Sequence, residues 1–170
     1  HEKERPVGFP IFRANFASML RSVDIVEKTN PDIIDINFGC PVKKVVCKGA
    51  GAGILKDIDK MEMLTREIAK RTKLPVTVKT RLGWDEKTIK IVEVAERIQD
   101  AGAKAITIHG RTRAQMYKGN ADWSLISEVK NNQRMKIPVF GNGDVNSPEK
   151  AVEMRDKYGL DGAMIGRASI

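Results

Sequence analysis

Short apolar runs alternate along this chain with segments in which apolar residues recur every three or four positions. The runs predict strands at residues 6–12, 33–37, 76–80, 105–109, 138–141 and 162–165. The three- and four-residue spacing predicts helices between them, at residues 18–28, from an N-cap at Asp59 with Met63, Leu64 and Ile68 on the apolar face, at 88–101, at 123–130 and from Ser147 to Tyr158.

The predicted strands are apolar almost throughout, which indicates that both faces of their sheet are buried. Such strands, alternating with helices, are typical of an α/β fold with a parallel sheet and helices outside it. Polar residues follow five successive strands at their carboxyl ends. This pattern favours a (β/α)8 TIM barrel, whose sites form at that rim, over a doubly wound sheet, in which functional residues gather near one switch point.

Six strands are too few to close an eight-stranded barrel. We therefore expect residues 1–170 to form one partial TIM-barrel domain, with barrel strands 3 to 8 present and strands 1 and 2 absent. The open sheet edges of such a domain predict that it pairs with another copy or is only partly ordered.

The composition is that of a globular protein, with 41% hydrophobic and 31% charged residues. No apolar run approaches the roughly 20 residues of a membrane-spanning helix and no signal peptide opens the chain, so we expect a cytoplasmic protein without membrane contact. The formal charge of +8 favours polyanionic partners. The spacing of Cys40 and Cys47 matches no metal signature, which predicts reduced thiols, no disulfide and no metal site.

The clearest candidate for chemistry is Cys40, which follows the strand at 33–37 in a Gly-Cys-Pro turn beside Asn37. A free thiol has a pKa of about 8.5, so it can act as a general acid or as a nucleophile. The alternative is an inert small apolar residue. Cys47, between Val46 and Lys48, does not lie in a comparable turn. The glycine-rich segment 49–53 lacks the pattern of a Walker loop, and it permits either close approach of a ligand or a tight return of the chain.

Other polar residues at strand ends suggest ligand contacts. Lys79 and His109 end successive strands, and a buried lysine needs an anionic partner, a flavin or a neighbouring carboxylate. Asn142-Gly143-Asp144 and Gly166-Arg167 end the last two strands, where such barrels commonly bind phosphate; tight turns are the alternative. Tyr117, in the polar loop after His109, can stack on a base or be a simple exposed residue.

Five motifs in order carry a family resemblance from Pro6 onward: DINFGCPVKKVVCKGAGAGIL, PVTVKTRLGWDE, AITIHGRTRAQMYKGNADW, IPVFGNGDV and DGAMIGRASI. With them the chain resembles the tRNA-dihydrouridine synthases of the bacterial type. The resemblance implies an FMN-dependent oxidoreductase that reduces the C5=C6 bond of uridine in tRNA, with NADPH as reductant. It implies tRNA and not DNA as the partner, and a C-terminal helical domain that this chain lacks.

The resemblance also implies roles for single residues. Cys40 corresponds to the general acid, Asn37 and Arg81 to substrate contacts, and Tyr117 is added to them as a stacking residue. Contacts to FMN are implied for Lys79, His109, Arg111, Asn142, Gly143, Asp144, Gly166 and Arg167. Pro10 and Arg13 stand where the family usually has a Gln-x-x-Gly pattern. Because proline has no N–H donor, the backbone of Pro10 cannot donate a hydrogen bond to FMN.

Two other functions stay open at this point. One is an FMN barrel that acts on free pyrimidines or enones, which needs no basic surface. The other is a non-catalytic module that binds RNA or protein, because two strands are missing and the usual glutamine is replaced. This piece by itself is expected to be inactive as an enzyme.

Overall fold

A computed structural model describes residues 2–13 and 15–169 and contains one six-stranded parallel sheet in the order β1-β2-β3-β4-β5-β6. The strands are β1 (Gly8–Ile11), β2 (Ile33–Asn37), β3 (Val76–Arg81), β4 (Ala105–His109), β5 (Val139–Asn142) and β6 (Gly162–Met164). The predicted α/β class with a parallel sheet is confirmed. The assignment of these strands to positions 3 to 8 of a barrel stays a prediction, as does self-association through β1 and β6, the two end strands.

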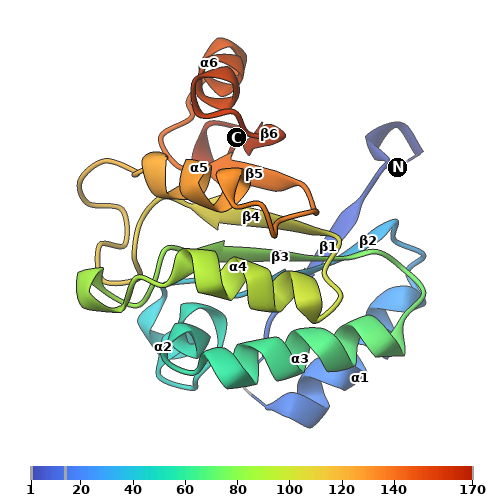
Figure 1. Cartoon of the computed structure of the whole chain (residues 1–170). Coiled ribbons are helices and arrows are strands. Elements are labelled where there is room, and N and C mark those ends of the chain that lie inside the picture. The colour runs from blue at the N-terminus through green and yellow to red at the C-terminus, as the bar shows by residue number, and fades with distance from the viewer. Residues whose placement is uncertain (1, 14, 170) are drawn as a thin grey trace.

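A helix of eight or more residues follows each of the first five strands. After β2, two shorter elements come before that helix. These helices are α1 (Phe16–Glu27), α3 (Ile58–Arg71), α4 (Ile91–Asp100), α5 (Ser124–Asn131) and α6 (Pro148–Tyr158). They line up in chain order along one side of the curved sheet (Figure 1), and each contacts the next. The sheet residues that face them are buried, such as Ile34, Ile36 and Ile106 at 0% exposure. Because side chains alternate along a strand, Asn37, Lys79 and His109 lie on the opposite face.

The predicted start of α3 was wrong by two residues. Asp57, not Asp59, is the N-cap, because its Oδ1 accepts a hydrogen bond from Lys60 N at 3.0 Å. The buried face of the helix is accordingly formed by Met61, Leu64 and Ile68, while Met63 is 47% exposed. Two aspartates so close together both suit a helix start, and only the fold distinguishes them.

The helix predicted at 88–101 begins later, at Ile91. Residues Glu86–Thr88 form a separate 3-10 turn, η3, and Asp85 caps it. The start of α6 is as predicted, with Ser147 accepting from Lys150 N at 3.1 Å and Pro148 in the first turn.

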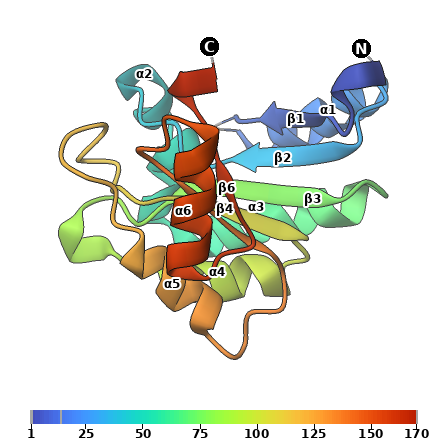
Figure 2. The same ribbon diagram turned by 90° about the horizontal axis from the view of Figure 1, so that it is seen from above.

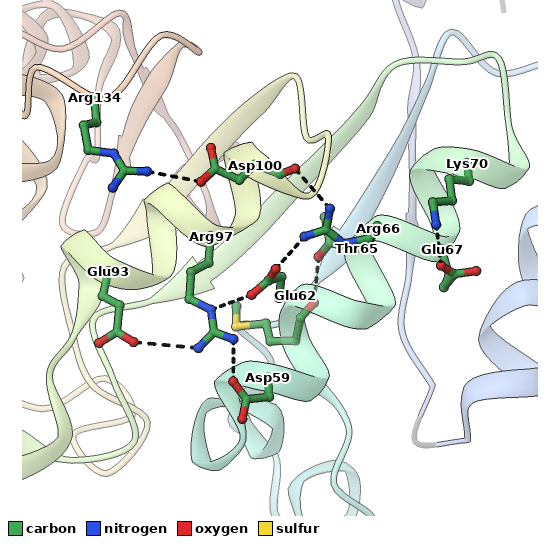
Figure 3. Close-up of polar contacts among 11 residues, drawn as sticks. Asp59, Glu62, Thr65, Arg66, Glu67, Lys70, Glu93, Arg97, Asp100 and Arg134 are labelled. Carbon is green, nitrogen blue, oxygen red and sulfur yellow. Dashed lines mark hydrogen bonds and ion pairs between the residues drawn. The ribbon is translucent and has the colours of Figure 1, made fainter.

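Helices α3 and α4 are joined by an ion-pair network centred on Arg97 (Figure 3). Arg97 Nε donates to Glu62 Oε2 at 2.6 Å, and another nitrogen of the same guanidinium bonds Asp59. Glu62 also accepts from Arg66 at 2.5 Å. Single partly exposed ion pairs contribute little, about 0–1 kcal/mol each, but this network fixes the two helices side by side. Asp59 thus bonds α4 instead of capping its own helix.

The connection between β2 and α3 holds two elements that the sequence did not predict. They are the one-turn helix α2 (Lys43–Val46) and the 3-10 turn η2 (Gly51–Lys56). Such short elements show no hydrophobic period. Two further 3-10 turns, η1 (Glu2–Glu4) and η4 (Arg167–Ser169), lie near the ends of the chain. None of the helices in the described ranges is long and apolar enough to span a bilayer.

Candidate active site

A cavity of about 780 Å³ opens at the carboxyl ends of the strands. In Figure 2 these ends point to the left, where α2, η3 and the loop after β4 also lie. The cavity is lined by all the residues for which the sequence predicted a site role: Asn37, Cys40, Lys79, Arg81, His109, Arg111, Tyr117, Asn142, Gly143, Asp144, Gly166 and Arg167. The fold therefore brings them together, and the role of each one stays a prediction.

Cys40 is held by its own strand end. Asn37 Oδ1 accepts hydrogen bonds from Gly39 N at 3.0 Å and from Cys40 N at 3.1 Å. This side-chain turn fixes the backbone of Cys40 before any ligand is present. It also occupies the amide oxygen of Asn37, so the group that Asn37 offers to the cavity is its NH2. The Asn-x-Gly-Cys pattern is the local signal for this turn.

The glycine-rich segment packs against the back of the same turn. A Cβ on Gly51 would lie 2.8 Å from Cys40 O and 2.9 Å from Cys40 Cβ, and Gly51 has a φ of +52°. Ala52 N donates to Cys40 O at 3.0 Å. Of the two interpretations of this segment, the tight return of the chain is therefore the one observed. The segment is in close contact with Cys40.

Replacing Gly51 by alanine should destabilise the protein more than the same change at Gly49. Both glycines have positive φ, +52° and +72°, so alanine costs about 1–2 kcal/mol of backbone strain at either. Only Gly51 adds a clash with Cys40, since a Cβ on Gly49 has no atom within 4 Å, and overpacking costs about 1–3 kcal/mol more. Urea unfolding of the two variants measures the difference. Equal losses would contradict the contact with Cys40.

Arg81 lies in the cavity wall and connects two loops by hydrogen bonds. Its side chain is buried, and Nε donates to Gly39 O at 2.8 Å. Nη1 donates to Thr112 O at 3.1 Å and to Met116 O at 2.8 Å. The guanidinium thus joins the turn of Cys40 to the loop that carries Tyr117. Sequence reasoning placed Arg81 near the substrate, which its position in the cavity wall allows, but it missed this connection.

Arg111 closes the same loop at its other end. Its Nη2 donates to Asp144 Oδ1 at 2.7 Å and to Gly119 O at 2.5 Å, and its Nε donates to Lys118 O at 3.1 Å. Asp144 also accepts from Ala121 N at 2.7 Å. Both residues lie in the cavity wall, but their hydrogen bonds go to the protein. Their predicted contacts with a cofactor stay untested beside this observed role in holding the loop.

His109 is a neutral ring in this environment. Burial lowers its pKa to about 3, and the cations of Arg81, Lys79 and Arg111 act in the same direction while Asp144 opposes them. Arg111 Nη1 lies 3.3 Å from His109 Nε2. Because a guanidinium only donates, Nε2 is the acceptor and the ring proton belongs on Nδ1. His109 can therefore act as a hydrogen-bond donor without carrying charge at neutral pH.

Lys79 also lies in the cavity wall, and its environment destabilises the protonated form of the side chain. Its pKa is lowered to about 8, chiefly by burial and also by the charge of Arg81, while Asp35 acts in the opposite direction. Among the described residues no ion pair uses Lys79. The salt bridge considered from the sequence is therefore not formed within the described part of the chain, which leaves Lys79 suited to an electron-rich or anionic ligand.

Tyr117 lies in the cavity wall, with its ring close to two arginines. The residue is 50% exposed. The centroid of its ring lies 4.7 Å from Arg167 Cζ, 5.7 Å from Arg81 Cζ and 6.4 Å from the His109 ring centroid. A half-exposed aromatic ring beside cations can stack on a planar ligand. The loop after β4 and the segment after β6 thus meet at this residue.

The two glycines predicted to bind phosphate differ. Gly143 has a φ of +117°, and a Cβ there would lie 2.7 Å from Ala121 Cβ, so packing alone requires glycine. At Gly166 the nearest described atom to an added Cβ would be Asn142 Nδ2 at 3.9 Å, so packing against the described residues does not require glycine there. Asn142 itself donates to Met164 O at 2.9 Å and so links β5 to β6.

Several lining residues were missed by the sequence reasoning. They are Gly39, Pro41, Val42, Val145, Asn146, Met164 and Ala168. Met164 pairs with Asn142 in the sheet register, so side-chain alternation placed it on the cavity side. The others lie within two positions of a predicted residue in the chain, and extending each strand-end motif by one or two positions finds them.

The family model described as "Dihydrouridine synthase (Dus)" matches residues 1–170, the whole chain. A probable tRNA-dihydrouridine synthase 1 of Synechocystis sp. is 42% identical over 168 residues, which are 99% of this chain and 47% of that protein. The tRNA-dihydrouridine synthase B of Vibrio vulnificus is 46% identical over 135 residues, which are 79% of this chain and 41% of that protein. The chain thus spans less than half the length of these relatives.

Solved structures with a similar fold include enzymes of low sequence identity. A mandelate oxidase variant with a monooxide FMN adduct has a TM-score of 0.65 at 18% identity, and the match covers 94% of this chain and 48% of that one. An active chimera of (S)-mandelate dehydrogenase has a TM-score of 0.65 at 13% identity, covering 95% and 52%. At such identities the likeness concerns the fold alone.

Proposed function

This chain belongs to the dihydrouridine synthase family, and from that premise we propose that the full-length protein reduces the C5=C6 bond of uridine in tRNA to dihydrouridine. The observation that carries the proposal is Cys40, held rigidly by Asn37 in the wall of a cavity rich in hydrogen-bond donors. A uridine has to leave the RNA stack to reach such a cavity, as the bases acted on by other base-modifying enzymes do.

The residues of the cavity fit FMN as the cofactor. The cations Lys79 and Arg167, the neutral donor His109 and the backbone at Gly166, all in the cavity wall, would hold the flavin ring and its phosphate. When bound and reduced by NADPH, FMN supplies the hydride that no side chain can donate. The mandelate oxidase variant of similar fold carries an FMN adduct, which is consistent with a flavin in this cavity.

The chain's own residues would supply the proton and the orientation. Reduction of C5=C6 adds a hydride to one carbon and a proton to the other. Cys40 would break its S–H bond and give the proton to C5, leaving a thiolate that solvent reprotonates. The NH2 of Asn37 would bond a carbonyl oxygen of the uracil, and Tyr117 would stack at the mouth.

The direct test is formation of dihydrouridine in unmodified tRNA by the full-length protein supplied with FMN and NADPH. Conversion of uridine at one or more positions is expected. If no tRNA is converted while free uracil or an enone is reduced, the proposal gives way to the alternative of a barrel that acts on small molecules.

The affinity for FMN should depend on pH through Lys79. Its pKa is lowered to about 8, so the ammonium charge is present below pH 8 and is lost as the pH rises through that value. An anionic ligand favours the charged form, and binding should therefore weaken by about three- to tenfold between pH 7 and pH 9. Titration of the flavin absorbance at several pH values measures this. The Lys79→Gln variant should bind more weakly at pH 7 and show a flatter profile, and an equally steep profile would exclude Lys79 as the cause.

A further inference from the structure

The connection between β2 and α3, residues 38–57, carries four lysines and one acid, Asp57, whose carboxylate caps α3. Residues 36–56 contain Lys43, Lys44, Lys48 and Lys56 and no aspartate or glutamate. Among the described residues no ion pair uses any of these lysines. The loop after β3, at 82–90, balances its two lysines with Asp85 and Glu86. The connection between β2 and α3, on the side of Cys40, is thus a positively charged part of the rim.

Two lysines of α2 and one just after it have exposed side chains, but the backbone that carries them is packed against the protein. Lys43, Lys44 and Lys48 point into solvent, whereas Val46 between them is 8% exposed. A Cβ on Gly53 would lie 2.7 Å from Val46 O, so the glycine-rich segment packs directly against the helix. Through Gly51 the same segment contacts Cys40. The lysines are therefore anchored to the turn that carries the thiol.

The helix also adjoins the mouth of the cavity. Pro41 and Val42 line it, and Val42 is 48% exposed immediately before Lys43. Figure 2 shows α2 at the end of the molecule to which the strands point. Three cations that form no ion pair with the described residues therefore lie beside the mouth of the cavity.

We infer that Lys43, Lys44 and Lys48 bind the phosphodiester backbone of RNA next to the nucleotide that enters the cavity. The inference rests on the proposed function. Lysine contacts to phosphate position a nucleic acid without reading its sequence, and they release counterions, which makes binding salt-dependent. Because the lysines are anchored to the Cys40 turn, the same contact aligns the target base with the thiol. This part of the chain would thus contribute to RNA binding itself.

The test compares two triple variants of the full-length protein in binding to unmodified tRNA over a range of salt concentrations. One replaces Lys43, Lys44 and Lys48 by alanine. The control replaces Lys73, Lys104 and Lys136, which are exposed and lie just before β3, β4 and β5, at the opposite end of the sheet. Each variant removes three positive charges, so the formal charge of these 170 residues falls from +8 to +5 in both.

The α2 variant should bind tRNA about tenfold or more weakly near 0.1 M salt, and its plot of log K against log salt should be shallower by about two to three. The control should lose less than about threefold. Single lysine variants of α2, each expected to reduce the slope by about one, give the same answer if the triple variant is poorly folded. Equal losses in both triples would overturn the inference, because net charge alone would explain them. A wild-type protein that binds no tRNA would overturn the proposed function as well.

Discussion

Replacing Cys40 by alanine is expected to lower the rate of dihydrouridine formation by about 10²- to 10⁴-fold, the usual contribution of a general acid. The change removes the thiol that would protonate C5. It leaves the backbone of the turn in place, because Asn37 Oδ1 bonds the amide of residue 40 and not its side chain. Single-turnover formation of dihydrouridine in tRNA measures the loss, and flavin absorbance of the same sample reports that FMN is retained.

Cys47 provides the matched control, because it is exposed, ends α2 and lies outside the cavity wall. Both cysteines are free thiols, so Cys47→Ala removes the same chemical group from the same segment. This variant should turn over at nearly the wild-type rate. Near-normal turnover in Cys40→Ala, or an equal loss in both variants, would exclude Cys40 as the acid.

Replacing Arg81 by methionine is expected to destabilise the protein by about 2–4 kcal/mol. Methionine fills much of the same volume but leaves three backbone carbonyls without their donor, those of Gly39, Thr112 and Met116. A buried acceptor that loses its partner costs about 1–3 kcal/mol. Arg81→Lys should recover only part of the loss, since an ammonium cannot span carbonyls on two loops as a planar guanidinium does.

Urea unfolding measures the change in free energy, and hydrogen exchange reports its location. Exchange should become faster in the Cys40 turn and in residues 112–117, the two segments that Arg81 joins. Arg155→Met is the control, because the side chain of Arg155 is exposed and, within the described residues, bonds only its neighbour Asp156. It should change stability by less than about 0.5 kcal/mol. A similarly small loss at Arg81, with unchanged exchange, would show that the two loops are not coupled through it.

The strands were predictable because each is a short apolar run ended by polar residues. β2 and β4 coincide with the prediction, and the polar residues after the strands gather in one cavity because the carboxyl ends of parallel strands share one edge. The start of α3 was misassigned because Asp57 and Asp59 are equally good caps by type. Helix α2 has four residues and shows no period, so nothing in its sequence separated it from a loop.

The sequence alone determined the order of strands and helices, the family, and the turn of Cys40, because each of these depends on residues close together in the chain. Asn37 reaches the amide of Cys40 within three residues. The tertiary structure decided which donors are occupied and which remain for a ligand. Arg81 bonds Gly39 across 42 residues and Arg111 bonds Asp144 across 33. It also decided the charge of His109 and Lys79, because a pKa depends on burial and on cations that only folding brings near.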